Sequence, residues 1–272
     1  MTALVNGIPD AGLDPYDRGL AYGDGVFRTL RIRAGYILNW QRQYNKLKAD
    51  SLALGITCPS EETLRDDLQI LQQADADCIA KIIITRGAGR GYAPPQSVQT
   101  NRIVLANALP THPQEYLIAG VRMILCETRL ASQPRLAGIK HLNRVENVLA
   151  RAEWRDPQIA EGRMLDINGN VIEGTHTNVF MLLGGVLYTP ALRHCGVAGV
   201  ERERILELSN ELNLKLEVQN LPLHYFIQAD EIFLCNSLIG VWQVSSFLSQ
   251  TWEQGKLTSV VRQLLDERTI ET

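Results

Sequence analysis

The sequence predicts an α+β protein of two domains, and three observations carry that prediction. Apolar residues recur every three or four positions in windows such as 41–54, which is typical of helices with one buried face. Short runs rich in β-branched residues, such as KIIIT at 81–85, are typical of strands. The proline-bearing segment LPTHP at 109–113 separates a first group of elements from a second, so we expect a domain break near residue 112.

Composition limits the possible functions. The chain has 272 residues, of which 45% are hydrophobic and 21% charged, and this suits a soluble globular protein of enzyme size. Its formal net charge is −3 and its acids and bases are mixed along the chain, so we do not expect a nucleic-acid partner. The first residues lack a basic segment followed by a long apolar core, and no apolar run reaches membrane-spanning length. We therefore expect a cytoplasmic protein without membrane association.

Cysteine and histidine usage indicates neither a disulfide framework nor a metal site. The five cysteines are odd in number, lie far apart and never form a C-x-x-C pair. The five histidines likewise lack the spacing of zinc ligands. We expect reduced thiols, some of them in the core, at Cys58, Cys78, Cys126, Cys195 and Cys235.

The elements expected in the first domain follow in order. A hairpin is predicted from strands at 26–32 and 35–38. Two helices are then predicted at 41–54 and 61–74, and two strands at 81–85 and 102–108. The last two strands are separated by 86–101, a glycine- and proline-rich loop that is too long for a simple connection. Long loops in compact domains often carry function, so this loop is a candidate for substrate contact.

The second domain is predicted to open with a strand at 121–127 and a helix from Leu142, whose apolar residues at 142, 145, 148, 149 and 152 are expected to form one buried face. Further strands are expected at 162–166, 177–183, 186–188, 217–219 and 231–234, and a helix is expected at 200–212. The segments DINGN and LGGV are expected to form hairpin turns. These elements give a first domain at 1–111, a linker at 112–118 and a second domain at 119–272.

Three local features are candidates for chemistry, and each has a plain structural alternative. Lys140 lies just before the predicted helix, where a surface lysine is the ordinary alternative. In CGVAGVERERIL two glycines lead into a helix, so the amides of Val200 and Glu201 can bind an anion or merely start the helix. In VIEGTHTNVF, Glu173 ends one strand and Asn178 starts another, where a solvated turn carboxylate is the alternative.

Four segments in order resemble the fold-type IV pyridoxal-phosphate (PLP) enzymes. They are YGDGVFRTLR at 22–31, AGIKHLNRVENVLAR at 137–151, the E-G-x-x-x-N run from Glu173, and the G-V-x-R helix start at Gly199. The resemblance covers nearly the whole chain. It implies a smaller N-terminal α/β domain, a larger C-terminal domain with mostly antiparallel or barrel-like strands, and a homodimer.

The resemblance also implies roles for individual residues. Lys140 would form a Schiff base with the cofactor aldehyde, and Glu173 would keep the pyridine nitrogen protonated. The other cofactor-binding positions that it implies are Asn178, Val197 against the ring, and Val200, Glu201, Asn236 and Ser237 at the phosphate. Where relatives have H-x-x-R-L, this chain has Gln43 and Lys46, so Lys46, or Arg42 with it, would replace the phosphate-binding arginine.

Within this family the lysine motif and RGAGRGY at 86–92 are most similar to aminodeoxychorismate lyases. This implies PLP-dependent elimination of pyruvate from 4-amino-4-deoxychorismate, giving 4-aminobenzoate for folate synthesis. A substrate with two carboxylates needs cations or hydroxyls, for which the candidates are Arg31, Arg90, Tyr92 and Arg144. Two alternatives stay open: a PLP-dependent aminotransferase acting on D- or branched-chain amino acids, and a non-catalytic PLP-binding module.

Overall fold

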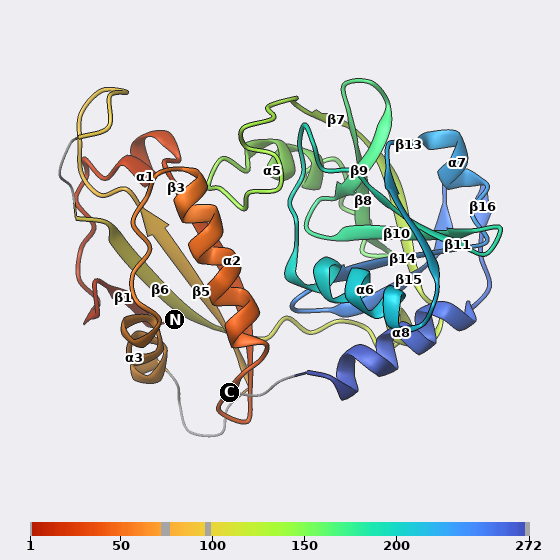
Figure 1. The fold of residues 1–272 in the computed structure, drawn as a ribbon, viewed down its shortest axis with the longest axis horizontal. Helices are drawn as coiled ribbons and strands as arrows, with labels where there is room; N and C mark the ends of the chain where they lie inside the picture. Colours follow the sequence, from red (N-terminus) through yellow and green to blue (C-terminus); the bar gives the residue numbers. More distant parts are fainter. Residues whose placement is uncertain (1, 72–76, 96–98, 270–272) are drawn as a thin grey trace. The chain divides into compact units, whose positions relative to one another are not determined.

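The computed structural model describes residues 2–71, 77–95 and 99–269 and divides into two compact units (Figure 1). The first unit contains the chain up to Pro110 together with Ile139–Asn143. The second unit contains Thr111–Gly138 and Arg144–Arg268. Each unit has its own sheet and its own hydrophobic core, so each is described separately.

The first unit is built on an antiparallel sheet of six strands in the order β2-β1-β6-β5-β3-β4. The strands are β1 Thr2–Val5, β2 Ile8–Pro9, β3 Gly25–Arg33, β4 Tyr36–Ile37, β5 Cys78–Thr85 and β6 Asn101–Ala108. The predicted hairpin and the two predicted strands are confirmed as β3–β4, β5 and β6, although β5 begins three residues earlier than expected. The sequence analysis did not predict β1 and β2.

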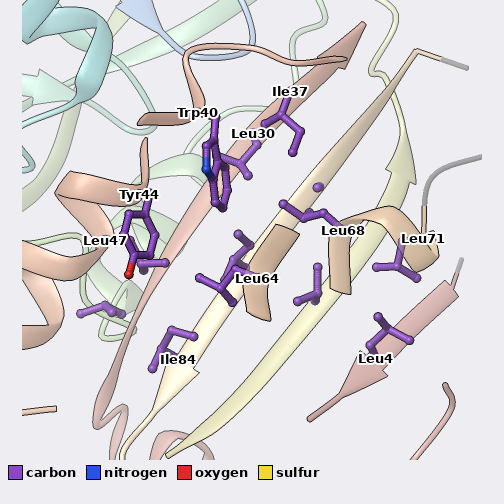
Figure 2. Packing of buried hydrophobic residues seen from close by; sticks show 14 of the residues in the cluster. Leu4, Leu30, Ile37, Trp40, Tyr44, Leu47, Leu64, Leu68, Leu71 and Ile84 are labelled. Carbon is purple, nitrogen blue, oxygen red and sulfur yellow. The ribbon is translucent and has the colours of Figure 1, made fainter. Parts of the chain in front are cut away.

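Helices cover one face of this sheet: α2 (Trp40–Ala53) and α3 (Glu61–Leu71), while the short α1 (Arg18–Tyr22) precedes β3 (Figure 1). The predicted helices at 41–54 and 61–74 are confirmed for the described residues, and residues 72–74 lie outside them. Alternate residues of the strands meet helix residues spaced three or four apart, which is the pattern of a half-buried sheet under amphipathic helices. Figure 2 shows this packing with Leu30, Ile84, Trp40, Tyr44, Leu47, Leu64 and Leu68.

The second unit has a ten-stranded sheet in the order β12-β11-β10-β14-β15-β7-β8-β9-β13, with β16 pairing to β15. Most pairings are antiparallel, and the parallel ones are β11 with β12, β15 with β7, and β7 with β8. The strands are β7 Val121–Leu130, β8 Ile159–Asp166, β9 Asn170–Gly174, β10 Asn178–Leu183, β11 Val186–Pro190, β12 Lys215–Gln219, β13 Leu221–Pro222, β14 Glu231–Asn236, β15 Gly240–Phe247 and β16 Gln250–Thr251.

The two hairpins predicted from turn signals are present in this sheet. The β8–β9 turn contains Gly169 with φ of +82°, and the β10–β11 turn contains Gly184 and Gly185 with φ of +56° and +79°. These positive φ values explain the glycines, because side chains are strained in that region. The two predicted hairpins are therefore confirmed as β8–β9 and β10–β11.

Five helices complete the second unit: α4 Glu115–Ile118, α5 Val145–Arg151, α6 Val200–Glu211, α7 Leu223–Ile227 and α8 Lys256–Glu267. The helices α6 and α8 lie against β14 and share a core around Ile205, Phe233 and Val261. A second core on the strands contains Val179, Leu234, Trp242 and Val244. None of the described helices is long and apolar enough to cross a membrane.

The helix expected from Leu142 is corrected by the structure. It begins at Val145, because residues 140–142 pair with β3 through backbone hydrogen bonds and a β-bridge. Its apolar residues do not form a buried face: Val145, Val148 and Leu149 are 69%, 65% and 56% exposed, while Ala150 is fully buried against the sheet. The apolar spacing correctly predicted a helix here, but the face of the helix that packs on the core is the one with Ala150.

The segment around Lys140 accounts for the largest difference between the predicted domains and the two units of the structure. The sequence analysis placed residues 119–272 in one domain, whereas Ile139–Asn143 packs with the first unit through its pairing with β3. The break between the units falls at Pro110 and Thr111, and the residues expected to form a linker include α4. A local linker signal cannot reveal a later segment that returns to an earlier sheet.

All five cysteines lie among the described residues and are free thiols, as predicted. Cys126, Cys195 and Cys235 are buried. Burial raises the pKa of the Cys126 and Cys195 thiols to about 12 and that of Cys235 still further. These side chains therefore act as small apolar groups in the core.

Candidate active site

The backbone of Lys140 is held at the edge of β3. The amide of Phe27 donates to the Lys140 carbonyl at 3.0 Å, and the amide of Leu142 donates to the Gly25 carbonyl at 3.0 Å. His141 forms a β-bridge with Val26. Lys140 therefore lies on a short strand-like segment rather than on a flexible loop, and this fixes the origin of its side chain.

The Lys140 ammonium lies over an aromatic ring. Its Nζ atom is 5.0 Å from the centre of the Phe27 ring, and the Nζ atom of Lys81 is 4.7 Å from the centre of the same ring. Phe27 alternates with the buried residues Val26 and Arg28 along β3, so it lies on the opposite face of the sheet from the core. The ring provides an apolar surface that orients the lysine side chain.

A buried carboxylate lies behind Lys140. Asp50 on α2 is 2% exposed, and its Oδ2 atom accepts a hydrogen bond of 3.1 Å from the Lys140 amide. The same carboxylate forms ion pairs with Arg28, which is 3% exposed, and with Lys46. The sequence analysis passed over Arg28 and Asp50, because an arginine in a strand and an aspartate in a helix carry no local signal of their pairing.

The structure places the predicted phosphate cation, Lys46, on α2 with its side chain 20% exposed. Gln43, which stands at the position of the usual histidine, is 3% exposed and faces the core. Arg42 lies four residues before Lys46 on the same helix and is partly exposed. Both cations of the predicted pair therefore project from one helix face.

In the second unit, Glu173 is held at the end of β9. It is 3% exposed, and its Oε2 atom accepts a hydrogen bond of 2.7 Å from the Val197 amide. A side chain at Gly196 would meet Ile172 at 2.7 Å and Glu173 at 3.4 Å, and its φ is +84°. Glycine at this position thus allows the loop to approach the carboxylate closely.

Asn178 fixes the same loop from the other side. Its Nδ2 atom donates to the Val197 carbonyl at 2.7 Å, and its Oδ1 atom accepts from the Gly199 amide at 3.1 Å. A Cβ atom at Gly199 would lie only 2.4 Å from that Oδ1 atom. Glu173 and Asn178 therefore set the position of Val197 and of the start of α6.

The start of α6 keeps the features of an anion-binding helix end. Gly199 is the N-cap residue, and no side chain caps the helix there. The Glu201 carboxylate forms an ion pair with Arg204 at 2.8 Å, and both side chains are nearly buried. The amides of Val200 and Glu201 are placed at the positive end of the helix dipole, as predicted from the sequence.

Asn236 and Ser237 lie in the turn that follows β14. The Asn236 Oδ1 atom accepts hydrogen bonds from the amides of Leu238 and Ile239 at 2.8 and 2.9 Å, and its Nδ2 atom donates to the His176 carbonyl at 3.1 Å. The Asn236 side chain is thus used to shape the turn and to join it to the segment after Glu173.

Sequence reasoning also missed Glu161, which organises the turn between Glu173 and Asn178. It is fully buried, and it accepts hydrogen bonds from the amide and hydroxyl of Thr175 and from the Thr177 hydroxyl at 2.5 to 2.9 Å. Burial raises the pKa of Glu161, but His176 and these donors outweigh burial and hold that pKa at about 2. The residue stands one position before a predicted strand, where nothing in the sequence indicates these contacts.

The four substrate-binding candidates are distributed over several elements. Arg31 lies on β3 on the same face as Phe27, with 35% of its side chain exposed and Asp77 at 3.9 Å. Arg90 stacks on the Tyr16 ring at 4.5 Å, and Tyr92 is 87% exposed. These three belong to the first unit, whereas Arg144, the N-cap residue of α5, belongs to the second.

The loop that carries Arg90 and Tyr92 is anchored by a buried arginine that the sequence analysis did not select. Arg18 donates to the carbonyls of Gly91 and Tyr92 at 2.6 and 3.2 Å, and its Nε atom pairs with Asp24 at 2.8 Å. Although residues 96–98 lie outside the described part, the loop is fixed up to Tyr92. The backbone from which Arg90 and Tyr92 extend therefore has a defined position.

The chain belongs to the class IV aminotransferase family, whose model, described as amino-transferase class IV, matches residues 25–247. It is 37% identical to the aminodeoxychorismate lyase of Vibrio harveyi over 89% of both chains. It is 28% identical to a putative branched-chain-amino-acid aminotransferase of Methanocaldococcus jannaschii, over 93% of this chain and 90% of that one.

Solved structures show the same relationship. The crystal structure of 4-amino-4-deoxychorismate lyase from Pseudomonas aeruginosa matches with a TM-score of 0.92 and 43% identity over 98% of each chain. Branched-chain aminotransferase from Escherichia coli matches with a TM-score of 0.86 but 22% identity, over 98% of this chain and 94% of that one, which supports the fold alone. The predicted α+β architecture of fold-type IV is confirmed.

Proposed function

We propose that this chain is an aminodeoxychorismate lyase that uses PLP to eliminate pyruvate from 4-amino-4-deoxychorismate and to release 4-aminobenzoate. The observation that carries the proposal is the lysine segment. AGIKHLNR, which is similar to the lyase form of the motif, holds Lys140 against β3 and Phe27. The 43% identity to the Pseudomonas aeruginosa lyase over nearly the whole chain supports the same activity.

The residues present fit PLP. Glu173 is a buried carboxylate anchored by the Val197 amide, and such a group suits a protonated pyridine nitrogen. The start of α6, with no side-chain cap, and the partly exposed ammonium of Lys46 suit a phosphate. Lys140 provides a primary amine on a fixed backbone. When bound, PLP supplies an electron sink for the reaction.

We assign the remaining steps to the chain's own side chains. Lys140 would hold the cofactor through its amine and, once freed by the substrate amine, would accept the proton from C4 of the substrate ring. Glu173 holds the proton on the pyridine nitrogen, and Asn178 keeps Val197 at the ring face. The amides of Val200 and Glu201 bind the phosphate.

Further contacts complete the proposed site. Asn236 and Ser237, in the turn after β14, would contact the phosphate, and Lys46 would add its charge. Arg31, Arg90, Tyr92 and Arg144 remain the proposed groups for the two substrate carboxylates. Of these, Arg90 and Tyr92 have the support of the Arg18 anchor, which gives their loop a defined position.

We also propose that the protein is a cytoplasmic homodimer and that α5 contributes to the interface. Val145, Val148 and Leu149 lie on this short helix and are 56% to 69% exposed. Three large apolar side chains side by side on one exposed helix are costly in water and are typical of a contact surface. A second copy of the chain would cover them.

Incubation of the PLP-loaded protein with 4-amino-4-deoxychorismate tests the activity. We expect 4-aminobenzoate and pyruvate in equal amounts, with no product from Lys140→Ala. The matched control is Lys48→Ala, which removes an exposed lysine of α2 and should leave turnover unchanged. Absence of 4-aminobenzoate from loaded wild-type protein would contradict the lyase proposal.

The similarity to a putative branched-chain aminotransferase makes transamination the second candidate. The same Lys140 and Glu173 would serve that reaction, so residue identity does not separate the two activities. Supplying D-alanine or a branched-chain amino acid with 2-oxoglutarate separates them, because only an aminotransferase forms the matching keto acid. A non-catalytic PLP-binding module is disfavoured by the intact Lys140, Glu173 and Asn178 set, and it would form none of these products.

A further inference from the structure

We propose that Asp50 is a positioning residue for Lys140. It acts through the Lys140 backbone amide, and its ion pairs with Arg28 and Lys46 allow it to stay buried as a carboxylate. The inference rests on the proposed role of Lys140 in binding the cofactor covalently. It concerns a contact that spans 90 residues of the chain.

The first argument is the bonding of the Lys140 backbone. Its carbonyl accepts from the Phe27 amide at 3.0 Å, so one side of the peptide unit belongs to the β3 edge. Its amide points to the Asp50 Oδ2 atom at 3.1 Å. Asp50 therefore supplies the second of two bonds that fix the backbone from which the reactive side chain extends.

The second argument is the charge around Asp50. The residue is 2% exposed and lies in the last turn of α2, which ends at Ala53, and a carboxylate there is opposed by both burial and the helix dipole. The ion pairs with Arg28 and Lys46 offset that cost. Because Arg28 comes from β3 and Asp50 from α2, the carboxylate is held rigidly between the sheet and the helix.

The third argument is the strength of the contact. A hydrogen bond to an ionised acceptor in a buried site is stronger than one between neutral groups, although the 3.1 Å separation of the Lys140 amide and Asp50 is that of an ordinary bond. Loss of this acceptor leaves a peptide amide without its partner and frees the Lys140 backbone to move. A lysine amine that must meet a carbonyl carbon is sensitive to small displacements of its backbone.

The experiment compares Arg28→Met with the double variants Arg28→Met/Asp50→Asn and Arg28→Met/Asp50→Leu. Asp50→Leu alone would leave Arg28 buried without a counter-charge and could unfold the protein. In the Arg28→Met background the buried guanidinium is absent, so the three proteins differ only at position 50. Lys46, whose side chain is 20% exposed, can reach solvent when its carboxylate partner is lost. Each must first show a thermal transition similar to that of the wild type.

Two measurements follow on the folded variants. Hydrogen exchange of the cofactor-free protein, read on the peptide containing Lys140, reports the backbone contact directly. Borohydride trapping of added PLP, followed by peptide mapping, reports the rate of covalent attachment at Lys140. Neither measurement depends on turnover of the loaded enzyme.

We expect Arg28→Met to retain slow exchange and near wild-type attachment, because Lys46 still pairs with the Asp50 carboxylate. Exchange at Lys140 should rise about tenfold or more, and attachment should slow about 3- to 30-fold, in the Asp50→Leu double variant. The Asp50→Asn double variant keeps a neutral acceptor oxygen. Its exchange rate and its attachment rate should therefore lie between those of the other two variants. This order of the three proteins is the signature of positioning by Asp50.

Equal exchange and equal attachment in the three variants would overturn the inference, and so would a change in only one of the two measurements. Wild-type protein that is trapped on Lys140 but makes no 4-aminobenzoate would instead remove the lyase proposal and leave Asp50 in its role. The two failures are therefore distinguishable.

Discussion

Substitution of Arg163 by methionine is expected to stabilise the protein. Arg163 lies on β8, is fully buried, and is among the largest fully buried side chains of the described chain. Its Nε and Nη1 atoms have no hydrogen-bond partner, and its Nη2 atom reaches only the Met123 sulfur at 3.5 Å. The guanidinium lies 4.1 Å from the centre of the Phe226 ring. This is a cation held in an apolar core.

The magnitude follows from these contacts. Two unpaired donors cost about 2 to 6 kcal/mol together, and a desolvated cation–π contact returns about 2 kcal/mol. Methionine keeps the unbranched stem as far as the position of Nε and has no donors that need partners. The difference is about 0 to 4 kcal/mol, and replacing buried ions by apolar side chains commonly gains about 1 to 4 kcal/mol, so we expect Arg163→Met to raise the free energy of unfolding by up to about 4 kcal/mol.

The dependence on pH provides an internal check. Burial lowers the pKa of Arg163 to about 9, against a partial opposing effect of Glu161. A base whose pKa is lower in the folded state binds fewer protons than in the unfolded state, so the wild type gains stability as the pH rises above about 9. The stability difference between Arg163→Met and wild type should therefore narrow as the pH rises through this range.

Thermal and urea unfolding, followed by tryptophan fluorescence, measure the effect. Each kcal/mol should raise Tm by about 2 to 4 °C in a protein of this size. The control is Arg122→Met on β7, whose exposed side chain bonds to Gln158 and whose replacement should change stability by less than about 0.5 kcal/mol. An Arg163→Met protein less stable than wild type would refute the reasoning and show that the guanidinium is a net stabilising group.

Four further predictions concern the proposed site and the interface. Borohydride reduction and peptide mapping should place the cofactor on Lys140, and label on another lysine would contradict the assignment. Glu173→Gln keeps the side-chain volume but loses the negative charge that stabilises the protonated pyridine nitrogen. Turnover should therefore fall by one to several powers of ten, about 1.4 kcal/mol of barrier for each, with PLP still bound. Near-normal turnover would return Glu173 to a structural role. Gly199→Ala forces a contact of 2.4 Å on Asn178 and should weaken PLP retention measured by absorbance after dialysis, unlike Gly12→Ala, which meets nothing within 4 Å. Val148→Glu should shift the mass measured by light scattering from dimer to monomer, and an unchanged mass would remove α5 from the proposed interface.

Much of the secondary structure follows from local patterns. Strands such as β5, β6 and β10 are rich in β-branched or apolar residues and are bounded by turn residues, so short-range sequence determines them. The turns at Gly169 and at Gly184–Gly185 need positive φ, which glycine indicates directly. The start of α6 was also correctly predicted at Val200, because a glycine pair and a helical pattern meet there.

The helix predicted from Leu142 shows where local patterns fail. The apolar spacing from Leu142 suits a helix, but the backbone hydrogen bonds of Lys140 and Leu142 join this segment to the β3 edge. Those bonds pair the segment with β3, and the helix begins only at Val145. Periodicity reports which residues are apolar, whereas a partner strand more than 100 residues away decides whether they become helical.

The candidate site divides in the same way. The residue types of Lys140, Glu173 and Asn178, together with their motifs, could be recognised from the sequence, because each motif is contiguous. Asp50 and Glu161 could not be recognised, because their meaning lies in contacts with Lys140 over 90 residues and with Thr175 and Thr177 over 14 to 16 residues. A buried carboxylate is stable only where folding brings donors to it from other elements, and those donors are chosen by the tertiary structure rather than by neighbours in the chain.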